Sequence, residues 1–306
     1  MRSGARHSKI AGVRCELLRG PIGLSAFAPA AASWLRRDPV RHNHLATVVS
    51  QRADGVLPVE PDAIWALLRD APDEPPTWVA TWTPPHLLLV PELDDAAAAA
   101  LVDALLEAGD VLPGVTGMAP GPGAVARVWA ERTGGTARPG MATKLLVLDS
   151  PRPPADVRGR LIKADWTYRP WLVKAVLGFE REVHNDEPVL VTEADAARTV
   201  DYLLSARLAW LWEVRGEPVT LVVNRPPASG AYRISLVYTP PDHRRHGYAA
   251  AATAGVSQHL LDIGARAVLL FTDAANATSN GVYERIGYRP VAAGETWVFA
   301  PTRTPS

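Results

Sequence analysis

The sequence predicts a mixed α/β protein built from two parts. The chain has 306 residues, about twice the length of a common domain. Three of the four residues at 151–154 are prolines, which forbid a helix and favour an extended connector. On both sides of this break, short apolar runs typical of strands alternate with segments of helical apolar spacing. We therefore predict a first domain over residues 1–150 and a second over residues 151–306, with a long surface loop as the alternative explanation of the break.

The second half opens with two predicted helices and three predicted strands. Residues 165–183 have the pattern of a helix, and Thr192 followed three residues later by Asp195 predicts the N-cap of a second helix that ends near residue 206. Residues 208–214 and 219–223 flank a turn and predict a hairpin. Residues 231–238 then predict a third strand.

The rest of the second half alternates helix and strand. Residues 247–263 predict a helix because one apolar stripe runs along it and Gly264 is a natural stop; the stripe consists of Ala252, Val256, Leu260 and Ile263. The apolar run at 267–271 predicts a strand buried on both faces. A short helix over 280–285, ended by Gly287, and a strand over 296–299 complete the order.

The first half repeats this order more weakly, in pattern and not in aligned residues. Strands are predicted at 78–82, 86–90, 114–117 and 143–148, and helices at 94–108 and 124–132. His42 and His44 flank Asn43 in a further predicted helix, where we expect polar surface.

Composition and charge exclude several classes of protein. Apolar residues make up 47% and charged residues 21%, which excludes a mostly disordered chain. The 32 basic residues balance the 32 acidic ones, so no surplus charge favours nucleic acid or an anionic membrane as a partner. Cys15 is the single cysteine and the histidines show no metal-ligand spacing, so we expect neither a disulfide nor a metal site. No apolar stretch has membrane-spanning length, and the first residues lack the apolar core of a signal peptide, which predicts a cytoplasmic protein.

The most informative segment is VYTPPDHRRHGYA at residues 237–249. A strand ends there, a Pro-Pro turn follows, and two arginines and a glycine precede a helix. The first turn of a helix offers unpaired N–H groups and partial positive charge, and a glycine lets an anion approach them closely. The segment is neither a Walker loop nor a dinucleotide-binding fingerprint, since it has a single glycine and no Gly-Lys-Ser/Thr. It predicts a phosphate site, with an exposed basic turn as the alternative.

Arg244, Gly247 and Ala249 resemble the Arg/Gln-x-x-Gly-x-Gly/Ala pyrophosphate loop of the GNAT-type N-acetyltransferases. The resemblance continues downstream and covers about residues 165–300. Its further parts are LFTDAAN at 270–276, Ser279-Asn280, Tyr283 and IGYRP at 286–290, which look like the strand-then-helix segment of that family.

This resemblance implies that acetyl-CoA is the co-substrate and assigns roles to individual residues. Main-chain groups of Val237, Tyr238 and Thr239 would bind the pantetheine arm, and the pyrophosphate would lie on Arg244, Arg245, His246, Gly247, Tyr248 and Ala249. Asn276 and Asn280 would bind the pantetheine amides, with turn formation and helix capping as the alternative. Tyr283 would protonate the departing thiolate, with core packing as the alternative. Many relatives carry glycine where Arg245 stands, which the loop tolerates if the φ of Arg245 is negative.

Amine acetylation also needs a base for the ammonium proton. Glu182 and Glu213 have suitable chemistry, and for each a solvated surface carboxylate is the alternative. We rank Glu182 first because Phe179-x-x-Glu182 resembles the substrate-side helix of some relatives.

The resemblance implies a mostly antiparallel central sheet flanked by helices, with two tandem GNAT-like halves, and an N-acetyltransferase that acts by direct attack of an amine. A small-molecule amine, an antibiotic, a peptide N-terminus and a protein lysine all stay open as acceptors. A non-catalytic acyl-CoA-binding or sensing protein is the first alternative. An acyltransferase that uses an aminoacyl-tRNA is the second, which the lack of basic surplus disfavours.

The first half is expected to bind no acetyl-CoA. Its corresponding connection is PELDD at residues 91–95, which has no glycine or arginine. Glu92, Asp94 and Asp95 suit the N-terminus of the following helix and would repel a pyrophosphate there. We therefore expect this half to be a degenerate domain or cap, serving as a structural partner or an acceptor-site wall.

Overall fold

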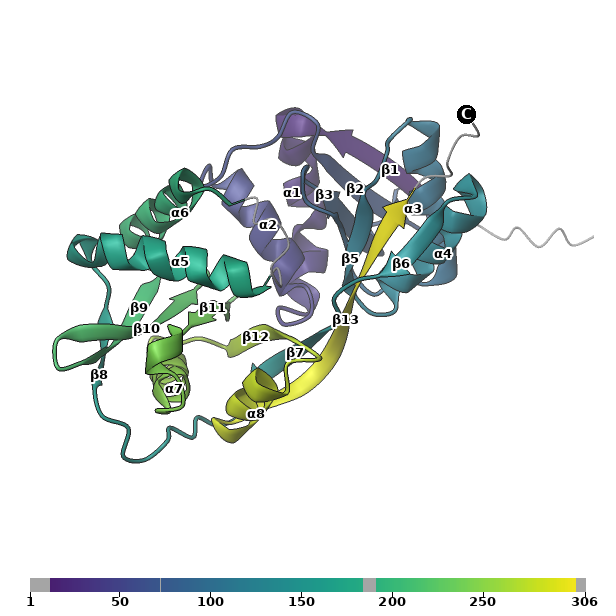
Figure 1. Cartoon of the computed structure of the whole chain (residues 1–306). Helices are drawn as coiled ribbons and strands as arrows, with labels where there is room; N and C mark the ends of the chain where they lie inside the picture. The colour runs from purple at the N-terminus through teal and green to yellow at the C-terminus, as the bar shows by residue number, and fades with distance from the viewer. Residues whose placement is uncertain (1–11, 72, 184–190, 301–306) are drawn as a thin grey trace, which may run out of the picture. The chain divides into compact units, whose positions relative to one another are not determined.

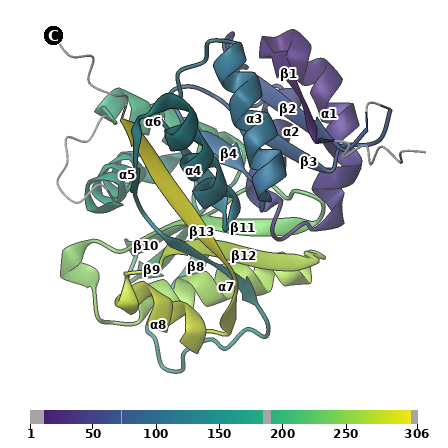
Figure 2. The ribbon, with the colours of Figure 1, turned by 90° about the vertical axis from the view of Figure 1, so that its right-hand side faces the viewer.

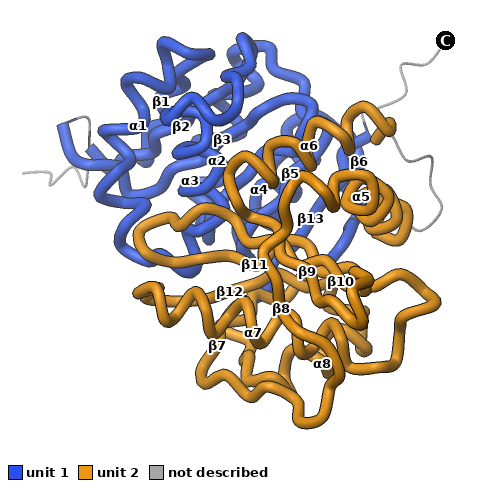
Figure 3. The backbone as a smooth tube through the Cα atoms, turned by 90° about the vertical axis from the view of Figure 1, so that its left-hand side faces the viewer, with its two compact units in different colours: residues 1–142, 293–306 blue, residues 143–292 orange. Residues whose placement is uncertain are grey.

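The computed structural model describes residues 12–71, 73–183 and 191–300 (Figure 1). The chain divides into two compact units: residues 1–142 with 293–306 form unit 1, and residues 143–292 form unit 2 (Figure 3). Within the described residues there are thirteen strands and eight α-helices. None of the helices in this part of the chain is long and apolar enough to cross a membrane.

Unit 1 is a twisted sheet with helices on both faces (Figure 2). Its elements are β1 (Arg14–Arg19), α1 (Gly20–Arg37), α2 (Asn43–Ala53), β2 (Ile64–Arg69), β3 (Trp78–Trp82), β4 (Leu88–Val90), α3 (Asp95–Glu107), β5 (Gly114–Met118), α4 (Gly121–Thr133) and β6 (Thr136–Pro139). The strands follow the order β1-β2-β3-β4-β5, antiparallel except for the parallel pair β4–β5. Alternation along β2 separates the two faces, since Ile64 and Leu68 pack with α3 and α4 while Trp65 meets Phe27 of α1.

Unit 2 has the same kind of architecture. Its elements are β7 (Thr143–Leu148), β8 (Arg160–Lys163), the 3₁₀ helix η1 (Trp166–Tyr168), α5 (Arg169–Val183), α6 (Glu193–Ser205), β9 (Ala209–Val214), β10 (Glu217–Asn224), β11 (Ala231–Tyr238), the 3₁₀ helix η2 (Pro241–His243), α7 (Tyr248–Asp262), β12 (Ala267–Asp273) and α8 (Ala277–Arg285). The strand order is β8-β9-β10-β11-β12-β7, with β11–β12 as its parallel pair. The last strand, β13 (Tyr288–Ala300), begins in unit 2 and continues into unit 1.

Two apolar clusters cover the two faces of the unit 2 sheet (Figure 1). On one face α5 and α6 contribute Leu172 and Leu203, which pack with Leu221 of β10. On the other face α7 contributes Val256, which packs with Leu270 of β12. The sheet is therefore buried on both sides, as its continuous apolar runs require.

The order of elements is the same in the two units. A strand, two helices, three strands, a helix, a strand and a helix follow one another from β1 to α4 and again from β8 to α8. The pattern repeat predicted from the sequence is therefore confirmed, and the predicted mixed, mostly antiparallel sheet is confirmed with it.

The division of the chain differs from the one drawn at residue 150. It falls at 142/143 and again at 292/293, because two strands join sheets away from their sequence neighbours. Residues Thr143–Val147 of β7 pair with β12 of unit 2, and Gly294–Val298 of β13 pair with β5 of unit 1. The proline-rich segment therefore lies inside unit 2.

Several elements begin or end at residues other than the predicted ones. The predicted start of the short helix at residue 280 is wrong: α8 begins at Ala277 because Asn276 caps it, its Oδ1 accepting the backbone N–H of Ser279. The final strand begins at Tyr288 instead of 296, since small residues within it hide its pattern. Ile263, predicted on the buried stripe of α7, is 55% exposed because the helix has already ended there. The capping box predicted at Thr192 and Asp195 is confirmed.

Candidate functional site

The strands β11 and β12 of unit 2 diverge towards their C-terminal ends. Their pairing register ends at Ile234 and Leu270, although β11 continues to Tyr238 and β12 to Asp273. Beyond that point β12 stays paired with β7 and β11 stays paired with β10. The register of β10 on β11 shifts between Val223 and Asn224, which marks a bulge where the separation begins. The sheet therefore opens into a fork, in which the facing edges of β11 and β12 form no backbone hydrogen bonds with each other.

The loop after β11 leads from this fork to the N-terminus of α7. The helix begins at Tyr248, and Gly247 is its N-cap residue with a φ of 81°. No side chain caps this end, so the N–H groups of the first turn lack a side-chain partner. A Cβ at Gly247 would lie 3.1 Å from Cγ2 of Val157, three residues after the prolines at 151–154. An uncapped helix N-terminus of this kind is a common place for an anion in proteins, and residues 244–249 stay a prediction for such a site.

Arg245 has a left-handed backbone conformation, which is unfavourable for a residue with a Cβ. Its φ is 66°, in the left-handed region, so the negative φ that was the condition for tolerating an arginine here is not present. A side chain in this region costs about 1 kcal/mol relative to glycine. The loop thus contains two residues with left-handed backbone, Arg245 and Gly247, separated by His246, and only the second is a glycine.

The structure brings together two residues predicted for different roles. Nη2 of Arg244 donates to Oε1 of Glu182, at the end of α5, and Nε of Arg244 donates to the carbonyl oxygen of Thr239 at 2.9 Å. Both charged side chains are more than 40% exposed. The proposed base and the proposed phosphate ligand therefore lie beside the same loop.

Only the main chain of Tyr238 can contribute to the fork, because its side chain faces α5. A Cβ at Gly178 would lie 2.3 Å from the Tyr238 hydroxyl, so the ring lies directly against that helix. Burial, followed by the nearby Glu182 carboxylate, raises the pKa of Tyr238. Gly178 thus makes room for the side chain of Tyr238, which the sequence did not reveal because the contact joins residues sixty positions apart.

Glu213 lies away from the loop, on β9. It is buried, its Oε1 accepts from Nε and Nη2 of Arg160 at 2.9 and 2.8 Å, and its Oε2 accepts from the Tyr168 hydroxyl at 2.9 Å. These hydrogen bonds lower the pKa of Glu213, and the bond from Arg160 has the larger effect. Both oxygens are therefore engaged in holding β8 and η1 against β9.

Tyr283 projects from α8 into the apolar cluster beneath α7. Its ring meets that of Tyr288 edge to face at 6.1 Å between centroids. Burial raises the pKa of Tyr283 to about 12, so its hydroxyl keeps its proton at neutral pH.

The two asparagines stabilise the turn between β12 and α8. Oδ1 of Asn276 caps the helix, which leaves its amide nitrogen for another partner. Asn280 is buried, and its Nδ2 donates to the carbonyl oxygens of Asp273 and Ala274 at 3.2 Å each. The capping and turn functions considered for these residues are thus both present.

Comparison with known proteins shows which fold this chain has. Residues 214–298, from the end of β9 into β13, match the FR47-like protein family model. The chain has the GNAT N-acetyltransferase fold in tandem form, as the sequence resemblance predicts.

Solved structures share this fold over nearly the whole chain. A GCN5-related N-acetyltransferase from Sphaerobacter thermophilus has a TM-score of 0.61 at 16% identity, covering 95% of this chain and 96% of that one. A GNAT-family acetyltransferase from Colwellia psychrerythraea has a TM-score of 0.58 at 8% identity, covering 94% and 100%. A tandem GNAT protein from the clavulanic acid biosynthesis pathway has a TM-score of 0.57 at 12% identity, covering 96% and 100%. A search of curated proteins found no match to this sequence.

Proposed function

We propose that this protein is an acetyl-CoA-dependent N-acetyltransferase whose single site lies in unit 2. The observation that carries the proposal is the fork between β11 and β12, which leads directly into an α7 N-terminus without a side-chain cap. A phosphopantetheine chain needs this combination: unpaired strand edges for its amides, and helix N–H groups for its pyrophosphate.

The residues present fit acetyl-CoA. Val237 offers main-chain groups at the fork, Thr239 just after β11 offers its N–H because its carbonyl oxygen already accepts from Arg244, and Gly247 leaves the start of α7 open to an anion. Arg245 adds positive charge beside it, and Arg244 would add more once a pyrophosphate replaced Glu182 as its partner. The amide nitrogen of Asn276 is available for the pantetheine arm, since its capping role uses Oδ1.

The reaction forms a bond between the acceptor nitrogen and the thioester carbonyl carbon and breaks the carbon–sulfur bond. Holding the two reactants in line supplies several kcal/mol of the barrier. We assign the proton for the departing thiolate to the Tyr283 hydroxyl, which stays protonated because of its raised pKa. We assign the ammonium proton to Glu182 and not to Glu213, because Arg160 and Tyr168 already occupy both oxygens of Glu213.

Unit 1 lacks room for a second pantetheine arm. Its parallel pair β4–β5 remains in register through Val90 and Gly117, up to the last residue of β4. A Cβ at Gly117 would lie 1.8 Å from the Val90 carbonyl oxygen. We therefore propose that unit 1 is the degenerate half and that one chain binds one acetyl-CoA.

A non-catalytic acyl-CoA-binding protein would share the fork and loop but would not need Tyr283. Two measurements on the full chain separate these functions. Calorimetry with acetyl-CoA should give one site per chain, and a screen of small-molecule and peptide amines that follows free CoA should identify an acceptor. Tight binding without CoA release for any amine would favour the sensing function, and absence of binding would refute both.

A further inference from the structure

A cavity of about 170 Å³ lies in unit 1, at the end of the sheet where α3 begins. The turn between α1 and α2, the start of β3, the β4–α3 connection and the end of β5 converge on it. The residues that define its chemistry are Trp34, Arg41, His42, Trp78, Glu92 and Met118. This position corresponds to the fork and loop of unit 2, because the β4–α3 connection of unit 1 matches the β11–α7 connection in element order.

The aromatic side of the cavity is rigid. The indole N–H of Trp34 donates to the carbonyl oxygen of Thr77 at 2.7 Å, which fixes the indole against β3. The His42 ring stacks on this indole, with centroids 3.7 Å apart and an interplanar angle of 12°. Trp78 adds a second indole to the lining. The sequence-based expectation that His42 lies on a polar surface is therefore wrong, because α1 packs its indole over the imidazole.

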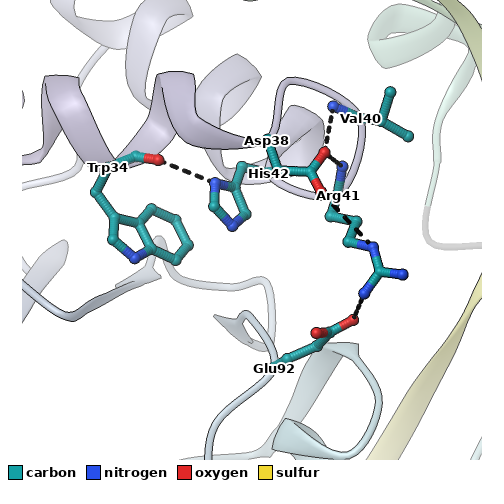
Figure 4. A network of polar contacts seen from close by, with 6 residues as sticks. All are labelled: Trp34, Asp38, Val40, Arg41, His42 and Glu92. Carbon is teal, nitrogen blue, oxygen red and sulfur yellow. Dashed lines mark hydrogen bonds and ion pairs between the residues drawn. The ribbon is translucent and has the colours of Figure 1, made fainter.

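His42 contributes a hydrogen-bond acceptor. Its Nδ1 lies 3.0 Å from the carbonyl oxygen of Trp34, which can only accept, so Nδ1 carries the proton (Figure 4). Burial lowers the pKa of His42, against the opposing effects of the Trp34 carbonyl, Asp38 and Glu92. The neutral ring therefore has a lone pair on Nε2.

Two charged side chains, Arg41 and Glu92, line the cavity, and Asp38 pairs with Arg41 from outside the lining. Nη1 of Arg41 lies 2.6 Å from Oε1 of Glu92, and Nε of Arg41 lies 3.6 Å from Oδ2 of Asp38 (Figure 4). One guanidinium thus faces two carboxylates, and the neutral imidazole adds no positive charge. The corresponding loop of unit 2 carries Arg244 and Arg245 instead, so the sign of the charge is reversed between the two halves.

We propose that this cavity binds a small organic cation, a protonated primary amine, whose N–H groups donate to Glu92 and to Nε2 of His42. The carbon chain of such an amine would lie against the indoles of Trp34 and Trp78, which attract a cation through their ring faces. The volume suits a molecule of a few heavy atoms and excludes a nucleotide. The proposal stands independently of acetyl-CoA binding in unit 2.

Three probes of matched shape and different charge test it on the full chain without acetyl-CoA: isobutylammonium, isobutyrate and isobutanol. Calorimetry, or NMR of the indole N–H signals, should show saturable binding of isobutylammonium only. Preference for isobutyrate would indicate an anion site built on Arg41, and equal weak effects of all three probes would indicate no specific site. Either result overturns the proposal.

Two substitutions of opposite expected effect make the test independent of misfolding. E92Q should weaken isobutylammonium binding about tenfold, because it removes the charge-assisted acceptor. R41Q should strengthen binding severalfold, since it releases the Glu92 carboxylate from its competing cation. E107Q, at an exposed position on α3, should change nothing. Loss of binding in both E92Q and R41Q, or in neither, contradicts the proposal.

Discussion

Arg244, three residues before the N-cap of α7, forms an ion pair with Glu182 at the end of α5. The pair connects the two sides of the candidate site, since α5 covers one face of the sheet and the loop follows the fork. It also neutralises the guanidinium that an incoming pyrophosphate would meet. The carboxylate proposed as the base is therefore already positioned by a residue of the cofactor loop.

Substitution of Glu182 should separate catalysis from binding. We expect E182Q to lower kcat about a hundredfold, the scale of a lost general base. The dissociation constant of acetyl-CoA should stay the same or fall, because Arg244 is released to meet the pyrophosphate. Steady-state kinetics with an identified amine, together with calorimetry, measure both. E217Q, at the exposed first residue of β10, is the matched control, and equal activity of the two variants would rule out Glu182 as the base.

Gly247 and Gly264 form a matched pair at the two ends of α7. Both have a positive φ, 81° and 94°, so alanine should cost each about 1 kcal/mol of folding free energy. G247A should also weaken acetyl-CoA binding about tenfold, because its Cβ stands beside the helix N–H groups. G264A should leave binding unchanged, since its surroundings are open. Thermal unfolding and calorimetry distinguish the effects; equal affinities would exclude the loop assignment.

Tyr283 and Tyr288 share one apolar cluster, and loss of their hydroxyl groups should have different consequences. Y283F should lower kcat about tenfold or more with little change in acetyl-CoA affinity, because the hydroxyl acts as charge develops on sulfur. Y288F should lower the unfolding midpoint instead, since its hydroxyl lies 2.7 Å from that of Ser257. Because the pKa of Tyr283 is near 12, the wild-type rate should show no alkaline loss from this group below about pH 11. Full turnover in Y283F would leave Tyr283 as a packing residue.

Glu213 should contribute to stability in a pH-dependent way. Its pKa in the fold is below the ordinary value of 4.5, so its contribution is complete above pH 4.5 and is lost as pH falls through the folded pKa. E213Q should therefore unfold at a lower temperature than wild type near pH 7, and this difference should shrink below pH 4.5. Melting curves across this range test the prediction. A pH-independent difference would show that packing, and not charge, makes the contribution.

Much of the candidate site could be predicted because its parts are local. The residues from Val237 to Ala249 are contiguous, and a strand end, a turn, a glycine and a helix start are all encoded within a few neighbours. The ion pair of Glu182 with Arg244 and the contact of Gly178 with Tyr238 could not be predicted, because each joins positions about sixty residues apart. The expectation for His42 is wrong for a different reason: its indole partner Trp34 is only eight residues away, but it lies on the preceding helix, and the polar pattern around His42 gives no information about that packing.

Much of the order of elements in the second half follows from local sequence, because apolar periodicity and capping residues act within one or two turns of chain. The strands β1, β2, β6 and β8 and the helix α1 were not predicted. The partner of each strand was decided only in the folded molecule. An apolar strand such as β7 fits equally well beside any strand of matching pattern. The sequence of Thr143–Leu148 predicts a strand but does not indicate that it pairs with β12. The same holds for β13, whose later residues complete the sheet of unit 1 beside β5. Pairing between distant strands depends on the geometry of the whole sheet, and no local pattern contains that information.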